Sequence, residues 1–272
     1  MSYSYLIREN YPRLTKSEKK VADYILSAGK AVIYSTMSDI KENTAVGDAT
    51  IIRFCQKLGF SGFSDLKIEV AKEDFGKQQE EPMATNYFQA SANRLKDSLS
   101  ATVQLLNEAT IEQAIQLISR SSHIYIFGVG SSGTTSLDLE TMFLRVGVQS
   151  KAIVDPHVQA QVASLLNKED MVIAFSLSGK TKDTYDSLEI AKKNGANILA
   201  ITNYIHSPIG RVADLVVQTA IEEFLDGGSL AGKISQLYIC DVLVQGYERN
   251  NNVNAVALRE KVLRSILNKQ ME

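Results

Sequence analysis

Cysteine and histidine are scarce in this sequence of 272 residues. Its two cysteines, Cys55 and Cys240, lie far apart, and neither belongs to a Cys-x-x-Cys motif. This pattern excludes a disulfide framework and predicts buried free thiols in a reducing compartment. The three histidines, His123, His157 and His206, are scattered along the chain. Because a metal site needs a cluster of ligands, we expect no bound metal.

Long apolar runs and a large net charge are also missing. No apolar run approaches the length of a membrane span, and no basic start is followed by an apolar segment. We therefore expect a cytoplasmic protein with no signal peptide. The net charge of -2 does not suit a nonspecific nucleic-acid coat. Residues 1–77 carry 12 Lys and Arg against 10 Asp and Glu, and the remainder carries 17 against 21, which favours an anionic partner for the first part.

The first part of the chain has only helical periodicity. Apolar residues recur at helical spacing over residues 14–75, which predicts an all-α domain at residues 1–76. The pattern then lapses into a polar stretch with Gly76 and Pro82, so we interpret residues 77–90 as a linker. A second domain is expected at residues 91–272.

In the second domain, short apolar runs alternate with helical patterns. This alternation predicts a five-stranded parallel sheet covered by helices on both faces, followed by two amphipathic helices at 229–249 and 254–268. The fold class is therefore an all-α bundle followed by an α/β domain. The expected strands are 123–128, 150–154, 170–176, 197–202 and 215–221.

Two consecutive short helices stand out in the first domain. Residues 37–44 predict one helix, residues 45–47 a turn, and residues 49–58 a second helix that Asp48 caps and Gly59 ends. A helix, a short turn containing Gly and a second helix form the plan of a helix-turn-helix motif.

The second of these helices has one apolar and one polar arc. In a helix-turn-helix the outward arc of the second helix enters the major groove of DNA. Arg53 could bind guanine or phosphate, Lys57 phosphate, and Thr50 either. The alternative is an ordinary amphipathic surface helix. The polar arc consists of Thr50, Arg53, Gln56 and Lys57.

Residues 50–66 resemble the DNA-binding domain of the RpiR family of regulators. The shared hallmark is a T-x-x-R-F-x-x-K-L-G-F run that continues into G-F and a further helix. Residues 14–18 and 21–25 match the opening helix of that family, so the resemblance covers about residues 10–72. One departure is Asp48, where the family commonly has Ser, which puts a phosphate contact by this residue in doubt. The resemblance implies a sequence-specific DNA-binding regulator.

Two loops of the second domain are rich in glycine and hydroxyl groups. Residues 128–133 satisfy G-x-G-x-x-G, the dinucleotide fingerprint, and Asp155 follows the next strand. Ser176, Ser178 and Thr181 form a competing motif, S-x-S-G-x-T, where the third strand ends and a helix begins. The start of a helix favours an anion, and hydroxyl groups can add hydrogen bonds to phosphate oxygens. Alternatively, these hydroxyl groups only cap helices.

This pair of loops is similar to the sugar isomerase (SIS) domain, a phosphosugar-binding fold, over about residues 122–221. The RpiR family joins the SIS domain to a helix-turn-helix in this order. The resemblance implies a phosphate held by Ser132, Ser176, Ser178 and Thr181, and Ser131 is a further candidate for binding the phosphosugar. Residues 155–159 match a D-x-H-x-Q stretch of the family, which faces either the sugar or a subunit contact. In this stretch His157 either binds the sugar or makes a structural hydrogen bond.

Three functions are compatible with these motifs. A ligand-responsive DNA-binding protein uses both domains. A sugar-phosphate isomerase would need a base. Glu222, which follows the fifth strand, is the candidate for this base, but its carboxylate could equally bind a sugar hydroxyl group. An NAD-dependent oxidoreductase depends on the fingerprint alone.

Only the first of these functions gives the DNA-binding half a use. We therefore expect a regulator of carbohydrate metabolism with operator DNA and a phosphorylated sugar as partners. No enzymatic activity and no cofactor are expected. A homodimer or homotetramer is expected because helix-turn-helix proteins bind paired half-sites.

Overall fold

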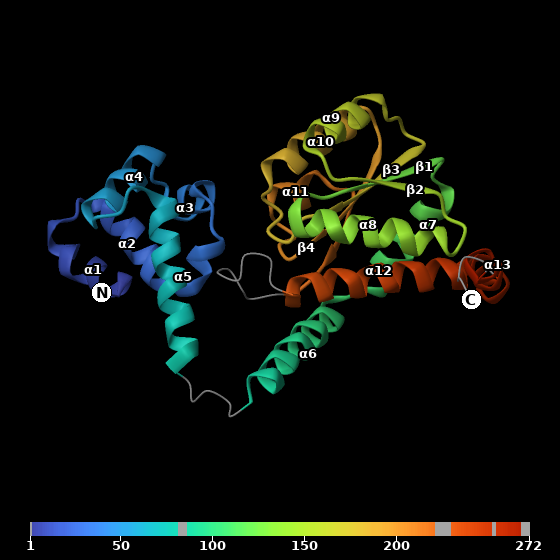
Figure 1. Cartoon of the computed structure of the whole chain (residues 1–272). Helices are drawn as coiled ribbons and strands as arrows, with labels where there is room; N and C mark the ends of the chain where they lie inside the picture. Colours follow the sequence, from blue (N-terminus) through green and yellow to red (C-terminus); the bar gives the residue numbers. More distant parts are fainter. Residues whose placement is uncertain (1, 81–85, 221–229, 252–253, 268–272) are drawn as a thin grey trace. The chain divides into compact units, whose positions relative to one another are not determined.

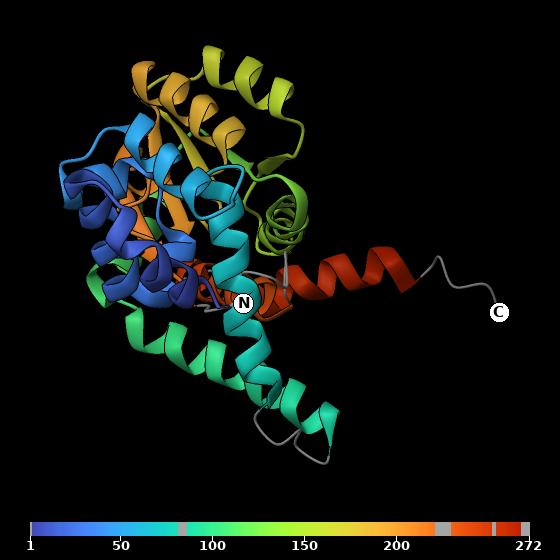
Figure 2. The ribbon, with the colours of Figure 1, turned by 90° about the vertical axis from the view of Figure 1, so that its left-hand side faces the viewer.

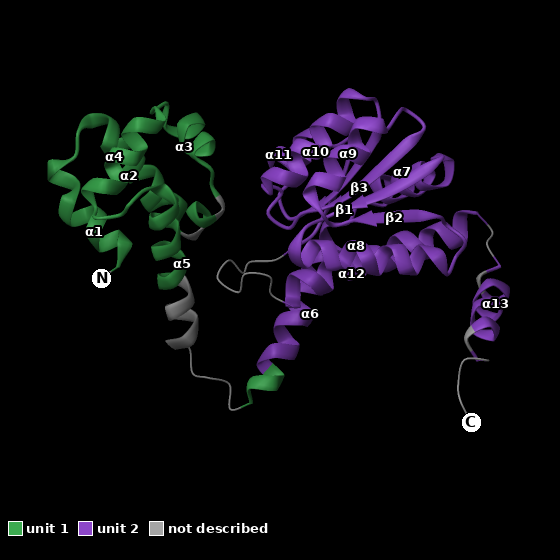
Figure 3. Cartoon of the chain, turned by 45° about the horizontal axis from the view of Figure 1, so that its top comes forward, with its two compact units in different colours: residues 1–89, 223–227 green, residues 90–222, 228–272 purple. Residues whose placement is uncertain are grey.

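The computed structural model describes residues 2–80, 86–220, 230–251 and 254–267. These form two compact units (Figure 3): described residues up to Gln89 belong to the first, and those from Ala90 onward to the second. Cys55 is buried and unpaired in the first unit and Cys240 in the second, as predicted. Burial raises the pKa of the Cys55 thiol to about 12.

The first unit is helical throughout. One shared core joins its helices, with the side chains of Val21, Ile25, Ile51 and Phe54 completely buried. The elements are α1 (Tyr3–Asn10), η1 (Tyr11–Arg13), α2 (Lys16–Ala28), η2 (Gly29–Tyr34), α3 (Met37–Thr44), α4 (Asp48–Lys57) and α5 (Phe63–Glu80).

Two helices of this unit, α2 and α3, begin at a side-chain cap. In α2, the Thr15 side chain accepts from the Glu18 backbone N–H at 3.3 Å, and Glu18 Oε2 accepts from the Thr15 N–H at 2.8 Å. This capping box satisfies two N–H groups that the first turn leaves free. The prediction that Asp48 caps α4 is wrong. Gly47 holds the cap position, and Asp48 is the first helical residue, 3.5 Å from Lys41 Nζ.

The second unit has the predicted five-stranded parallel sheet. Each strand lies where an apolar run predicts it, because strands covered on both faces have no polar side to interrupt the run. The helices are α6 (Tyr87–Leu105), α7 (Glu108–Arg120), α8 (Gly130–Leu144), α9 (Pro156–Leu165), α10 (Lys182–Lys193), α11 (Pro208–Val212), α12 (Leu230–Asn250) and α13 (Ala255–Leu267). The strands are β1 (His123–Phe127), β2 (Ser150–Ile153), β3 (Asp170–Phe175), β4 (Asn197–Thr202) and β5 (Leu215–Gln218).

Helices cover both faces of the sheet (Figure 1 and Figure 2). Alternate residues of one strand face opposite layers. In β3, Met171, Ile173 and Phe175 pack in the cluster that includes α7, α8 and α12. Val172 and Ala174 pack in the cluster that includes α9, α10 and α11. The central strand is therefore buried along its whole length, which fixes the register of its neighbours.

The strand order is β2-β1-β3-β4-β5. The connection from β1 runs to one side of the sheet and the connections from β3 run to the other, so the order reverses between β1 and β3. Open α/β sheets bind ligands at such a switch point, at the carboxyl ends of the strands.

Among the described residues, no helix is both long and apolar enough to cross a membrane.

Candidate functional site

The turn between α3 and α4 depends on a left-handed residue. Ala45 has φ 54° and ψ 35° and ends α3, with its N–H donating to the Lys41 carbonyl at 2.8 Å. This conformation directs the chain back within three residues, so α4 follows α3 closely. Helix, turn and helix therefore lie as the sequence predicts.

Helix α4 presents a polar face to solvent. Ile51, Phe54 and Cys55 are buried on its inner side. The exposed side chains include Arg53 and Gln56, while Thr50 is half-buried. Arg53 Nη2 donates to Thr50 Oγ1 at 2.9 Å. This bond leaves most of the guanidinium N–H groups available to an acceptor outside the protein.

Lys57 has an internal partner that the sequence did not reveal. Its ammonium lies 2.6 Å from Glu18 Oε2, and Glu18 is only 3% exposed. Burial by itself would raise the pKa of Glu18, but the hydrogen bonds from Lys57 and Thr15 outweigh burial, and the pKa is lowered. Lys57 thus joins α4 to the capping box of α2. An ammonium has three N–H groups, so two remain for another acceptor.

The loop after β1 is shorter than the sequence indicates. Helix α8 begins at Gly130, so Ser131 and Ser132 lie in its first turn. A Cβ on Gly128 would lie 2.6 Å from the Ser132 carbonyl oxygen, so only glycine permits this approach. Ser132 is 8% exposed, and its Oγ accepts from Gln236 Nε2 at 3.2 Å. The sequence signal for Gln236 is a polar residue, next to Ser235, in the mostly apolar buried stripe of α12.

The loop after β3 places three hydroxyl groups beside the start of α10. Ser176 is buried, and its Oγ lies 3.1 Å from Thr181 Oγ1. Ser178 is exposed, and its Oγ accepts from the Lys180 N–H at 3.2 Å. Gly179 has φ 63°, and a Cβ there would lie 2.0 Å from Ser207 Oγ. Glycine is therefore required for the tight turn.

These hydroxyl groups do not cap the helices. Thr181 holds the cap position of α10 and Val129 that of α8, yet neither helix start accepts a side-chain cap bond. Because β1 and β3 are neighbouring parallel strands, their carboxyl ends lie side by side. The side chains that follow these ends, Ser132, Ser176 and Thr181, define what we call the β1/β3 edge of the sheet. Two helix N-termini and several hydroxyl groups at one edge can bind an anion without a charged side chain.

Helix α9 begins beside this edge. Asp155 caps it by accepting from the Val158 N–H at 3.0 Å. His157 is exposed, and its side chain makes no hydrogen bond to the described residues. Gln159 is fully buried, and its Nε2 donates to the carbonyl oxygens of Gly128 at 3.1 Å and Ile153 at 2.7 Å. Gln159 thus holds the glycine turn in place. Glu222 lies outside the described residues.

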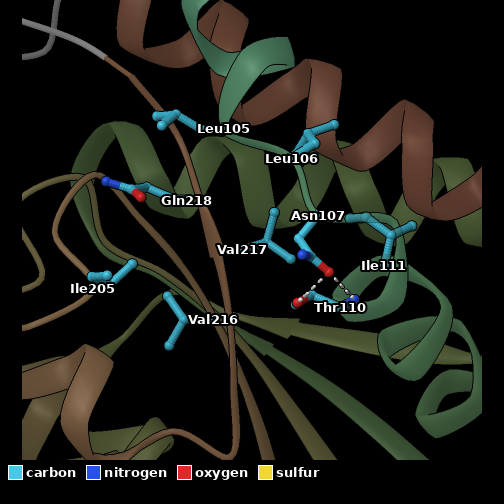
Figure 4. A pocket seen from close by; sticks show the side chains of 9 residues that line it. All are labelled: Leu105, Leu106, Asn107, Thr110, Ile111, Ile205, Val216, Val217 and Gln218. Carbon is cyan, nitrogen blue, oxygen red and sulfur yellow. Dashed lines mark hydrogen bonds between the residues drawn. The ribbon is translucent and has the colours of Figure 1, made fainter.

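A cavity of about 180 Å³ lies elsewhere, against edge strand β5 (Figure 4). Its polar groups have internal partners: Asn107 Oδ1 accepts from the Thr110 N–H at 3.0 Å, and Gln218 Nε2 donates to the Asn203 carbonyl at 2.9 Å. The cavity is therefore a poor candidate for a polar ligand. Its lining consists of Leu105, Leu106, Asn107, Thr110, Ile111, Ile205, Val216, Val217 and Gln218.

Comparison with known proteins assigns both units. Residues 1–77 match the helix-turn-helix domain of the rpiR family, and residues 117–245 match the SIS domain. An HTH-type transcriptional regulator of Haemophilus influenzae is 33% identical over 96% of this chain and 95% of its own length. The chain belongs to the RpiR family of transcription regulators. RpiR of Escherichia coli K12 is 31% identical over 86% of this RpiR-family chain and 82% of its own.

Solved structures agree with this assignment to the RpiR family. The Vibrio vulnificus NanR protein complexed with ManNAc-6P superposes with a TM-score of 0.82 at 26% identity, covering 98% of this chain and 99% of NanR. The sugar isomerase domain of an RpiR transcription factor from Sphaerobacter thermophilus gives 0.59 at 23% identity over 65% of this chain and 97% of its own. The latter similarity establishes the SIS fold of the second unit.

Proposed function

We propose that this RpiR-family regulator binds a phosphorylated sugar at the β1/β3 edge of its sheet and that the bound sugar changes its affinity for operator DNA. The observation that carries the proposal is that Ser132, Ser176 and Thr181 lie at this edge beside two helix starts without side-chain caps. Hydrogen bonds to a charged acceptor are about twice as strong as neutral ones, so this edge favours a phosphate. The structural relative from V. vulnificus is described with ManNAc-6P, a sugar phosphate.

The ligand is tested by a thermal-shift screen of sugar phosphates that includes ManNAc-6P. Ligand at about a hundred times its dissociation constant stabilises the folded state by about 2.7 kcal/mol. Each hydroxyl bond to a charged oxygen contributes roughly 1.5–3 kcal/mol, so the double variant Ser178→Ala/Thr181→Ala should bind at least about a hundredfold more weakly. Ser164→Ala, on the exposed side of α9, is the matched control and should bind as the wild type does.

The screen tests the class of ligand, and the double variant tests the location of the site. A shift with the sugar phosphate and none with the unphosphorylated sugar supports the proposal. A double variant that shifts as much as the wild type places the ligand elsewhere in the protein.

For DNA, we assign the recognition surface to the outward face of α4. Thr50, Arg53 and Gln56 lie there, and two N–H groups of Lys57 remain for a backbone phosphate. Arg53→Ala should cost about 1–3 kcal/mol of operator affinity and relax the preference at one base pair, if the contact is to a base edge. Lys193→Ala, an exposed lysine of α10, is the charge-matched control. Gel retardation in which Arg53→Ala binds operator as tightly as the control contradicts this assignment.

We assign no catalytic step to the protein. An isomerase needs a base placed between neighbouring sugar carbons. Of the candidates, Glu222 lies outside the described residues, and His157 is exposed at the start of α9. An aldose–ketose conversion assay with the sugar phosphate that binds should therefore show no turnover.

The protein is proposed to act as a homodimer or homotetramer in the cytoplasm, where operator DNA is found. A single recognition helix reads only one half-site, and two copies can read two half-sites one helical turn apart. Light scattering coupled to size-exclusion chromatography tests this directly, and a monomer that still binds operator specifically would contradict it.

A further inference from the structure

A buried amide controls the direction of one hydroxyl group at the ligand edge. Gln236 of α12 is completely buried. Its Nε2 donates to Ser132 Oγ at 3.2 Å, and its Oε1 accepts from Thr135 Oγ1 at 3.2 Å. Both ends of the amide are engaged, the donating end with Ser132 and the accepting end with Thr135, whose hydroxyl group also lies 3.4 Å from the Ser131 carbonyl oxygen.

After its bond with Gln236, the Ser132 hydroxyl group still has its own proton to donate. A serine hydroxyl group has one proton and two lone pairs. One lone pair of Ser132 Oγ accepts the hydrogen bond from Gln236 Nε2. No described residue accepts the proton of Ser132 itself, although the residue is only 8% exposed. A buried donor without an acceptor is unfavourable, and a ligand oxygen at this edge would satisfy it.

The amide also changes the strength of this donor. A hydroxyl group that accepts a hydrogen bond becomes a better donor, because the bonds along a chain polarise one another. The chain from Thr135 through Gln236 to Ser132 therefore favours a partner that only accepts, such as a phosphate oxygen.

We propose that Gln236 is a positioning residue that presets the Ser132 hydroxyl group as a donor to a phosphate oxygen of the ligand without touching the ligand itself. This inference rests on the proposed function, since it assumes that the anion binds at the β1/β3 edge. It predicts that the contribution of Gln236 to anion binding passes through Ser132.

A double-mutant cycle tests this dependence. Inorganic phosphate is titrated by calorimetry into the full-length wild type, Gln236→Met, Ser132→Ala and the double variant. Methionine keeps the shape of glutamine but has no N–H donor. Each single variant should bind phosphate about tenfold more weakly, and the double variant should be no weaker than Ser132→Ala alone. Gln245→Met, an exposed residue of the same helix, is the control and should bind normally.

A second variant keeps the test valid if Gln236→Met disturbs the fold. Thr135→Val leaves Gln236 in place and removes the bond to its Oε1 together with the longer bond of Thr135 Oγ1 to the Ser131 carbonyl at 3.4 Å, so phosphate affinity should fall severalfold. Unchanged affinity in both Gln236→Met and Thr135→Val overturns the inference. Additive losses in Gln236→Met and Ser132→Ala also overturn it, because Gln236 would then act by another route.

Failure of the proposed function gives a different result. If Ser178→Ala/Thr181→Ala binds inorganic phosphate as well as the wild type does, the anion does not bind at this edge, and both proposals fall. If that double variant loses binding while Gln236→Met keeps it, the site stands and only the role of Gln236 is lost.

Discussion

At the residue scale, the pair of Lys57 and Glu18 has two roles to reconcile. The ion pair joins α4 to α2, and the same ammonium lies on the face proposed to meet DNA. Loss of DNA binding in a Lys57 variant would therefore have two causes that cannot be separated, a lost phosphate contact and a disturbed position of α4. Arg53, whose described side-chain bond is to Thr50 on the same helix, is the cleaner probe of DNA contact.

Replacing Lys57 by Met should destabilise the protein in a pH-dependent way. The pKa of Glu18 is lowered in the folded state, so its ion pair stabilises the fold above the ordinary value of 4.5, and this contribution is lost as the pH falls through the lowered pKa. Without Lys57, burial leaves an unpaired carboxylate, which should lower the free energy of unfolding by about 1–3 kcal/mol near pH 7. Solvent screening places the loss near the lower end, because Lys57 is 42% exposed.

Urea unfolding at about pH 7 and about pH 4 measures this effect. The difference between Lys57→Met and the wild type should shrink at the lower pH. Lys72→Met, which removes an i,i+3 pair with the more exposed Glu69, is the control and should change stability by about 0.5 kcal/mol or less. An equal difference at both pH values would show that Glu18 does not mediate the effect.

Some residue roles could not be predicted from the sequence. Lys57 and Glu18 are separated by 39 positions, and no local pattern pairs them. Gln236 and Ser132 are 104 positions apart. Such contacts are set by how helices pack on the sheet, whereas the polar face of α4 follows from helical periodicity and was predicted correctly.

At the element scale, the strands were the most predictable part. The run predicted at 197–202 matches β4 to the residue. The sequence indicates a loop at residues 128–133, because Gly130 and Gly133 are poor helix formers, but α8 already begins at Gly130. The start of α4 was predicted from a cap at Asp48, although Gly47 holds that position. The ends of helices are harder to predict than their middles, because more than one neighbouring residue can take the cap position.

Helix α6 is bonded to α12 within the second unit. Buried Ser98 of α6 lies 2.7 Å from Ser235 Oγ and donates to the Ala220 carbonyl at 2.8 Å. Ser235 is the neighbour of Gln236, which bonds to Ser132. The chain passes from the first unit to the second between Gln89 and Ala90, near the start of α6. These bonds therefore connect the proposed ligand edge to the helix in which the first unit ends.

The variant Ser98→Ala/Ser235→Ala should uncouple ligand binding from DNA binding. Phosphate affinity should stay within about twofold, because neither hydroxyl group lies at the ligand edge. The change in operator affinity on adding ligand should shrink, since coupling requires an element that both sites bias. Ser121→Ala, whose hydroxyl group bonds only within α7, is the control. A ligand response equal to the control in the double variant contradicts this link.

At the scale of the whole molecule, two units with different chemistry make one regulator. The first offers a polar helix face, and the second offers hydroxyl groups at a sheet edge. Alternation of apolar runs and helices predicted the architecture of the second unit, and the resemblance at residues 50–66 predicted the identity of the first. A ligand changes DNA binding only if it binds the DNA-competent and DNA-incompetent states with different affinity.

The most direct measurement of the central claim is operator affinity with and without the sugar phosphate that gives the largest thermal shift. We expect ligand to change the operator affinity of the wild type by about 5- to 150-fold, the usual range of coupling between two sites. The double variant Ser178→Ala/Thr181→Ala should bind operator as the wild type does without ligand, and adding ligand should change nothing. A double variant whose operator affinity still responds to ligand as the wild type's does would contradict the account.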